Sequence, residues 1–250
     1  MTVIDRTTAT KRVPMDSLRK TALIAGVIYL ITFISIPTIA LYGPVRNDPN
    51  YIAGPGPDTP VIFGGVLEII VALACIGAAV VLYPVVKRQN EAVAMGFIGA
   101  RVLEAAAIFA GVVSILSVVT LRQAGAGPDA LVTGQALVAL HNWTTLLGQG
   151  FVPAVNALLL GSLLYRSRLV PRIIPLVGLL GAPLLVVSDI ATLFGLKEPV
   201  SALSALAALP MALWEFSLGV YLIVKGFKPS PITARMVAAD TRPADQDAIA

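Results

Sequence analysis

Six long runs of apolar residues, separated by short polar segments, dominate the sequence. They cover residues 21–41, 61–86, 92–121, 135–165, 173–194 and 202–224. A helix needs about 20 apolar residues to cross the hydrocarbon core of a bilayer, and every run is long enough. Lipid offers no hydrogen-bond partners to the backbone, and the runs are too long for barrel strands. Each run therefore predicts a transmembrane helix.

The composition agrees with a membrane-embedded fold. Hydrophobic residues make up 57% of the 250 residues, whereas charged residues make up only 13%, and soluble domains carry about 25%. A soluble globule with this composition would expose large apolar patches and aggregate. A lipid bilayer, the first expected partner, covers such patches. The predicted fold class is an all-α polytopic membrane bundle of six transmembrane helices.

Lysine and arginine are distributed unevenly between the polar segments. The two tails and the loops after the second and fourth runs carry fourteen of these residues, and the alternate loops carry three: Arg46, Arg122 and Lys197. Because cytoplasmic loops carry the basic excess, both termini are predicted to be cytoplasmic. The expected organisation is a cytoplasmic N-terminal tail (1–20), a transmembrane domain (21–225) and a disordered cytoplasmic C-terminal tail (226–250).

Motifs with well-defined chemistry are absent from the sequence. With one histidine, His141, and one cysteine, Cys75, it has no HExxH zinc site, no multi-histidine zinc site and no internal disulfide. It has no Walker-type phosphate loop and no GxSxG serine elbow, and its basic residues do not interleave with aromatic ones. The sequence thus predicts no cofactor, no metal and no nucleic-acid partner.

Six ionisable residues nevertheless fall inside the apolar runs. Each costs several kcal/mol in lipid unless it faces a partner or a cavity. Four acids, one arginine and a neutral histidine leave three excess negative charges, which a low dielectric opposes. Some of these carboxylates must therefore be protonated, exposed to water or balanced by a bound cation. At about 1.5 Å per residue they fall into two layers: an outer layer of Glu68, His141 and Asp189, and a central one of Arg101, Glu104 and Glu215.

Polar residues also follow one face of the fourth run. His141, Thr145, Gln149 and Asn156 fall within about 80° of a regular helix, and Asn142 lies at the edge of this sector. In the third run, Arg101 can pair with Glu104 three residues later, or bridge to Glu215 in the sixth. These features predict a binding site, here called the central cluster, made of Arg101, Glu104, Glu215, Gln149, Asn142 and Asn156. The outer layer is a second candidate site.

Two segments resemble a known family. The third run contains GFIGARVLEAAAIF (residues 96–109), and the sixth run continues into LWEFSLGVYLIVKGFKPS (213–230). With six spans over about 220 residues, they resemble the bacterial multi-pass membrane family known as domain of unknown function 4386. The resemblance implies a membrane fold and, with the charge bias, the plasma membrane of a prokaryote. It carries over no activity and no catalytic residues.

Three functions remain as competing hypotheses. The leading one is a proton-sensitive protein that binds or transports a cation or a small polar solute at the central cluster, because buried acid is in surplus. In the second, the protein is a structural or partner-binding membrane subunit, and its polar residues only join helices. In the third, it is an intramembrane enzyme that uses His141 with Glu68 or Asp189 as base or ligand. The ligand, the oligomeric state and the convergence of the polar residues on one cavity stay open.

Overall fold

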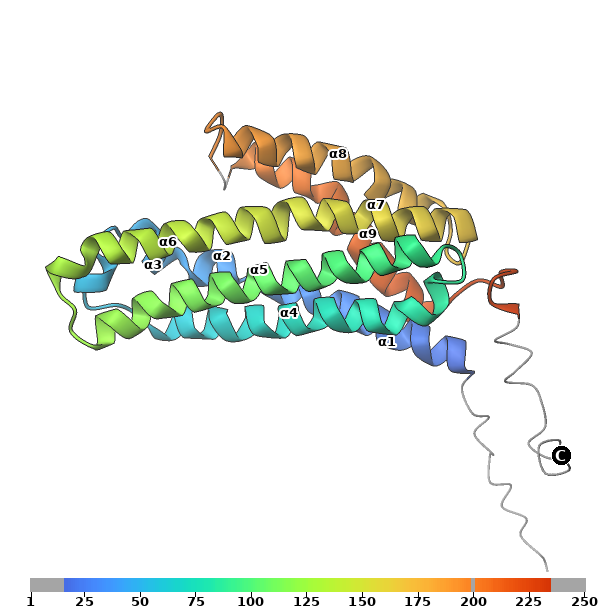
Figure 1. The fold of residues 1–250 in the computed structure, drawn as a ribbon, viewed down its shortest axis with the longest axis horizontal. Helices are drawn as coiled ribbons and strands as arrows, with labels where there is room; N and C mark the ends of the chain where they lie inside the picture. Colours follow the sequence, from blue (N-terminus) through green and yellow to red (C-terminus); the bar gives the residue numbers. More distant parts are fainter. Residues whose placement is uncertain (1–15, 199–200, 235–250) are drawn as a thin grey trace, which may run out of the picture.

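Six apolar helical segments form the molecule. The computed structural model describes residues 16–198 and 201–234, and within these it contains helices and no strands (Figure 1). The segments long and apolar enough to cross a membrane are Ser17–Leu41, Thr59–Val86, Glu91–Gln123, Pro128–Ser167, Ile173–Leu193 and Ala202–Val224. The predicted all-α bundle of six spans is confirmed, and the chain is a multi-pass membrane protein. The fourth span begins at Pro128, earlier than the predicted start at residue 135.

Four of the spans are continuous α-helices: α4 (Thr59–Val86), α5 (Glu91–Gln123), α8 (Ile173–Leu193) and α9 (Ala202–Val224). Side-chain caps fix where two of them begin. The carboxamide of Asn90 accepts a hydrogen bond from the Val93 amide (3.1 Å), and the Ser201 hydroxyl accepts one from the Ser204 amide (3.2 Å). The described parts of the two predicted tails are short, since residues 1–15 and 235–250 lie outside the described residues.

The first span is broken near its middle. It consists of α1 (Ser17–Ile31), the 3-10 turn η1 (Thr32–Ser35) and α2 (Thr38–Leu41). Pro37 lacks an amide hydrogen and its ring displaces the preceding turn, so the α-helix cannot continue through it. The Thr32 hydroxyl donates to the Tyr29 carbonyl (2.7 Å) and the Thr38 hydroxyl to the Ser35 carbonyl (2.6 Å). These hydroxyls therefore satisfy carbonyls that the break would leave free.

The fourth span is interrupted in a different way. It consists of η3 (Pro128–Ala130), α6 (Leu131–Thr145), the π-helical turn η4 (Leu146–Phe151) and α7 (Val152–Ser167). A π-helical turn contains one extra residue, so it rotates the side chains that follow relative to those before it. Two short elements, α3 (Gly43–Asn47) and η2 (Tyr51–Ala53), lie in the connection between the first and second spans.

The spans pack as a closed ring. Each one packs on its two ring neighbours, in the order α1, α4, α5, α6–α7, α8, α9 and back to α1. Small residues allow the closest of these approaches. A Cβ atom at Gly26 of α1 would lie 2.6 Å from the carbonyl oxygen of Gly219 in α9. The ring leaves space for side chains of all six spans at its centre.

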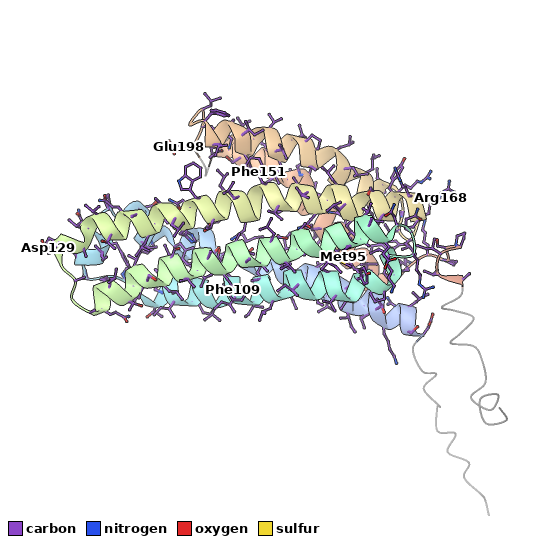
Figure 2. The ribbon with its side chains drawn as sticks, viewed as in Figure 1. Met95, Phe109, Asp129, Phe151, Arg168 and Glu198 are labelled. Atoms are coloured by element: carbon purple, nitrogen blue, oxygen red, sulfur yellow. The ribbon has the colours of Figure 1, made fainter. Side chains whose placement is uncertain are left out.

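The outward surface of the ring is apolar between two charged ends. Figure 2 shows Met95 and Phe109 projecting outward from α5, and both are at least one-third exposed. Asp129 and Arg168 lie at opposite ends of the molecule in the same view. This arrangement suits a bilayer, because the exposed apolar belt faces lipid and the charged ends face water.

The two chain ends of the bundle lie at the same end of the ring (Figure 1). There the Arg19 guanidinium donates to the carbonyls of Leu222 (2.8 Å) and Ile223 (2.5 Å). The opposite end is here called the distal end. Figure 1 shows α4, α5 and α6 extending beyond α8 at the distal end, as expected from lengths of 33 residues for α5 and 21 for α8.

At the distal end, one carboxylate fixes the first loop to α5. Asp58 forms a bidentate ion pair with Arg122, and it also accepts hydrogen bonds from Gln123 (2.8 Å) and from the Tyr51 hydroxyl (2.8 Å). Arg122 donates further to the Gly54 carbonyl (3.1 Å). The Arg122 guanidinium lowers the pKa of Asp58 to about 2, because the bidentate contact favours the charged carboxylate.

Neutralising Asp58 should therefore have an effect that depends on pH. We expect Asp58→Asn to lower the Tm of the detergent-solubilised protein by a few degrees at pH 6. The folded pKa of Asp58, about 2, lies below the unfolded value of about 3.9. The carboxylate thus stabilises the fold above about pH 4 and loses this effect as the pH falls towards 2. The difference in Tm should shrink over that interval, and Asp129→Asn, an exposed control, should show none. A constant difference would contradict the assignment.

Candidate functional site

One cavity of about 640 Å³ lies at the centre of the ring. This volume is within the range of small-molecule sites, about 300–1,000 Å³. All six spans contribute to its wall, which apolar and polar side chains line in about equal numbers. The ionisable residues among them are Arg46, Glu68, Arg101, Glu104, His141, Asp189 and Glu215. The central cluster and the outer layer therefore meet in a single cavity.

Arg101 is the hub of the central cluster. Its Nη1 atom lies 3.0 Å from Glu104 Oε2, and its Nη2 atom lies 3.0 Å from Glu215 Oε1. Nη2 also donates to the Tyr29 hydroxyl (3.1 Å), and Nη1 donates to the Cys75 sulfur (3.6 Å). Arg101 is only 2% exposed. A buried guanidinium needs such partners, and here they come from α1, α4, α5 and α9.

Glu104 has a second partner on the fourth span. The Asn156 side-chain amide donates to Glu104 Oε2 at 2.7 Å, so this oxygen accepts from both Asn156 and Arg101. Asn156 is buried and lies outside the cavity wall, and its Oδ1 atom has no hydrogen-bond partner among the residues that the structure describes. Asn156 therefore positions the Glu104 carboxylate from behind.

Glu68 is held by neutral donors. It accepts hydrogen bonds from the Tyr42 hydroxyl (2.9 Å) and from the Gln149 amide (3.1 Å), and it is 3% exposed. Among the described residues no cation forms an ion pair with it. The Tyr42 ring also meets the His141 ring edge-on, with centroids 5.0 Å apart, and His141 Nδ1 lies 3.1 Å from the Gly111 carbonyl. Tyr42 thus joins Glu68 to His141 without a direct bond between them.

Asp189 is the least satisfied carboxylate in the cavity wall. It is 7% exposed, and its side chain forms no hydrogen bond or ion pair with any described residue. Its Oδ2 atom is buried against the π-helical turn, where a Cβ atom at Gly150 would lie 2.5 Å away. Buried polar atoms normally have a partner, so this carboxylate has unused hydrogen-bond acceptor capacity among the described residues.

A smaller cavity of about 370 Å³ lies towards the distal end, between the first loop and α6. Arg46 and Asn142 line both cavities, so they form the boundary between them. The Arg46 side chain forms no hydrogen bond or ion pair with a described residue, whereas its backbone amide donates to the Tyr42 carbonyl (3.0 Å). Burial lowers the pKa of Arg46, and the nearby Glu68 carboxylate opposes this shift.

The sequence of the chain assigns it to a protein family. A family model described as Domain of unknown function (DUF4386) matches residues 24–226. The chain belongs to the DUF4386 family. The match runs from α1 to the end of α9 and therefore includes the whole cavity wall, and it confirms the resemblance seen in residues 96–109 and 213–230. No curated protein and no solved structure matches the chain.

In this DUF4386 protein the structure brings most of the candidate residues together. The cavity is lined by Arg101, Glu104, Glu215, Gln149, Asn142, Glu68, His141 and Asp189, and only Asn156 of the candidates lies outside its wall. No group of three His, Cys, Asp or Glu side chains in the described part is placed to hold a metal ion. Glu68 pairs with Tyr42 and Gln149 rather than with His141.

Sequence reasoning missed four residues of the DUF4386 site. By their sequence positions, Tyr29 and Cys75 resemble residues that pack inside an apolar helix. Tyr42 resembles an anchor at the membrane interface, and Arg46 belongs to an external loop. A buried tyrosine hydroxyl needs a polar partner. Tyr29 and Tyr42 were therefore the two residues that the sequence could have indicated as part of the site. Counting Arg46, the cavity holds four carboxylates and two guanidinium groups. Two negative charges are therefore in excess when all are ionised and His141 is neutral.

Proposed function

We propose that the protein binds a small, positively charged solute in the central cavity, as the binding step of transport. The observation that carries the proposal is the excess of carboxylates over guanidinium groups in one cavity. Arg101 is shared by Glu104 and Glu215, whereas Glu68 and Asp189 have no cation in contact among the described residues. A positively charged solute between these two carboxylates would supply the missing charge.

Two interrupted helices support a role in transport. The first and fourth spans are the first spans of the two three-helix halves, and three crossings per half give the halves opposite directions across the membrane. Transporters with such halves bind their substrates where discontinuous helices in corresponding positions meet. Here η1 and η4, the interrupted segments of the two spans, both contribute to the cavity wall.

The proposed orientation places both termini in the cytoplasm and the distal end outside the plasma membrane of a prokaryote. The basic excess in the tails and in the second and fourth loops supports it. Thr192 and Ser204, at the distal ends of α8 and α9, line the cavity. In this arrangement the cavity opens towards the external side, and Asn142 and Gln149 lie along the approach.

Ligand-dependent thermal stability tests this function. We expect a small cation, inorganic or alkylammonium, to raise the Tm of the purified protein, because binding at about 100 times Kd adds about 2.7 kcal/mol. Glu68→Gln and Asp189→Asn should each weaken the binding at least ten-fold, since each removes a charge-assisted contact worth about 1.5–3 kcal/mol. The matched controls are Glu91→Gln and Asp129→Asn, whose carboxylates are exposed. An equal shift in all four variants, or no shift in the wild type, would refute the proposal.

A second candidate function is a structural or partner-binding membrane subunit. The observation that favours it is the closed contact of Arg101, which joins four helices and is 2% exposed. In that case no cation would shift the Tm, and replacing the central charges would change stability alone. A stoichiometric partner would then co-purify with the protein from mild detergent.

A further inference from the structure

The two carboxylates that have no cation in contact among the described residues both contact the same π-helical turn. Glu68 on α4 accepts a hydrogen bond from Gln149, and Asp189 on α8 packs against Gly150. Gln149 and Gly150 are consecutive residues of η4. Glu68 and Asp189 therefore contact consecutive residues of η4 from two different helices, and both line the central cavity.

Each carboxylate is satisfied to a different degree. Glu68 has two neutral donors, Tyr42 and Gln149, and Arg46 acts on it through the cavity without an ion pair. Asp189 has no hydrogen-bond donor among the described residues, and Lys197 acts on it only from a distance. Neither carboxylate touches the Arg101 guanidinium, which Glu104 and Glu215 already occupy. Two separate positions for a positive charge thus remain open.

Apolar side chains, here together called the apolar wall, make up about half of the residues that line the central cavity. Side chains from five different helical segments line it, namely Val71, Ile108, Leu146, Leu185 and Met211. An inorganic cation gains nothing from such a surface, because apolar side chains cannot replace its hydration shell. A methylene chain does gain, since it leaves water for an apolar environment. The cavity therefore combines two acidic positions with a surface suited to a hydrocarbon linker.

We propose that the solute is a linear α,ω-diamine, with one ammonium group at Glu68, the other at Asp189, and its methylene chain along the apolar wall. This inference rests on the proposed function and specifies its substrate class. Two ammonium groups match the two excess negative charges of the cavity. The cavity volume of about 640 Å³ accommodates a chain of several methylene groups.

A matched pair of ligands tests the proposal on the complete protein. Binding of α,ω-diamines with three to six methylene groups is measured by Tm shift and by calorimetry, next to n-alkylamines with the same number of carbons. We expect at least one diamine to bind about ten-fold or more tightly than its monoamine, because a second charge-assisted contact adds at least that factor. A diamine that binds no better than its monoamine at every length overturns the diamine assignment, while monoamine binding alone leaves the proposed function standing. No binding by either ligand overturns both.

Variants locate the second ammonium group. Asp189→Asn and Glu68→Gln should each reduce the affinity for the diamine to about that of the monoamine. In the double variant, the ratio between diamine and monoamine affinity should be about the same as in either single variant. Both substitutions preserve side-chain shape, and the comparison of ligands in the wild type requires no variant if one fails to fold. The exposed controls Asp129→Asn and Glu91→Gln should retain the full ratio between diamine and monoamine. An unchanged ratio in Asp189→Asn would overturn the inference.

Discussion

Arg101→Met is expected to leave little folded protein after solubilisation. The substitution removes the only guanidinium in contact with Glu104 and Glu215 among the described residues, and it leaves two carboxylates uncompensated at the centre of the ring. Removing one partner of a buried ion pair costs about 3–5 kcal/mol. This is a large part of a typical stability of about 5–15 kcal/mol. The loss should be visible as aggregation in size-exclusion chromatography and as a much lower Tm.

Three variants separate this effect from a general loss of positive charge. Arg88→Met, at an exposed arginine, should leave the Tm nearly unchanged. Arg101→Lys keeps the charge but loses the forked geometry, so its Tm should fall between those of the wild type and Arg101→Met. Adding Glu104→Gln and Glu215→Gln to Arg101→Met should recover much of the lost stability, because no unpaired charge remains. An Arg101→Met protein as stable as the wild type would show that the guanidinium does not hold the helices together.

Gly148→Ala is expected to separate the fourth span from α5. A Cβ atom at Gly148 would lie 2.4 Å from the Cβ atom of Ala107, which is attached to the backbone and cannot rotate away. Overpacking of this kind costs about 1–3 kcal/mol. Gly148 belongs to η4, so the shift also moves Gln149 and Gly150 at the cavity wall. We expect a Tm several degrees lower, together with weaker binding of any cavity ligand.

Two further substitutions make this prediction specific. In the double variant Gly148→Ala with Ala107→Gly, the lost space is returned from the other helix, and most of the Tm should be restored. Gly99→Ala, also in a helix, meets no atom within 4 Å and serves as the control. It should be neutral or slightly stabilising, because alanine is the better helix former. If Gly148→Ala and Gly99→Ala behave alike, the contact between α5 and η4 is not tight.

Much of the fold was predictable, because lipid restricts the backbone so strongly. The length of an apolar run and the spacing of Arg101 and Glu104 do not depend on how the helices are arranged. Both ion pairs considered for Arg101 are present at once in the structure. A buried Tyr29 hydroxyl indicates that it needs a polar partner, but the sequence could not assign Tyr29 or Cys75 to Arg101, since they lie on other helices. Their distance from Arg101 depends on how the ring closes.

The register of the fourth span was the main point that regular periodicity could not give. A constant 100° per residue places Asn156 on the same stripe as His141 and Gln149. The π-helical turn at Leu146–Phe151 shifts this register. Gln149 and His141 therefore line the cavity, while Asn156 lies behind Glu104. The break after Ile31 likewise turns Tyr42 towards Glu68 instead of the interface.

The unequal lengths of the helices have a consequence for how the protein sits in its membrane. At about 1.5 Å per residue, the 21 residues of α8 match the hydrocarbon thickness, whereas the 33 residues of α5 exceed it. The distal parts of α4, α5 and α6 project beyond the end of α8, and the ion pair of Asp58 and Arg122 joins the first loop to α5 in this projection. A projection of fixed shape is a suitable epitope for an antibody fragment. The bound fragment would add mass for imaging, and its binding to sealed vesicles would show on which side of the membrane the distal end lies.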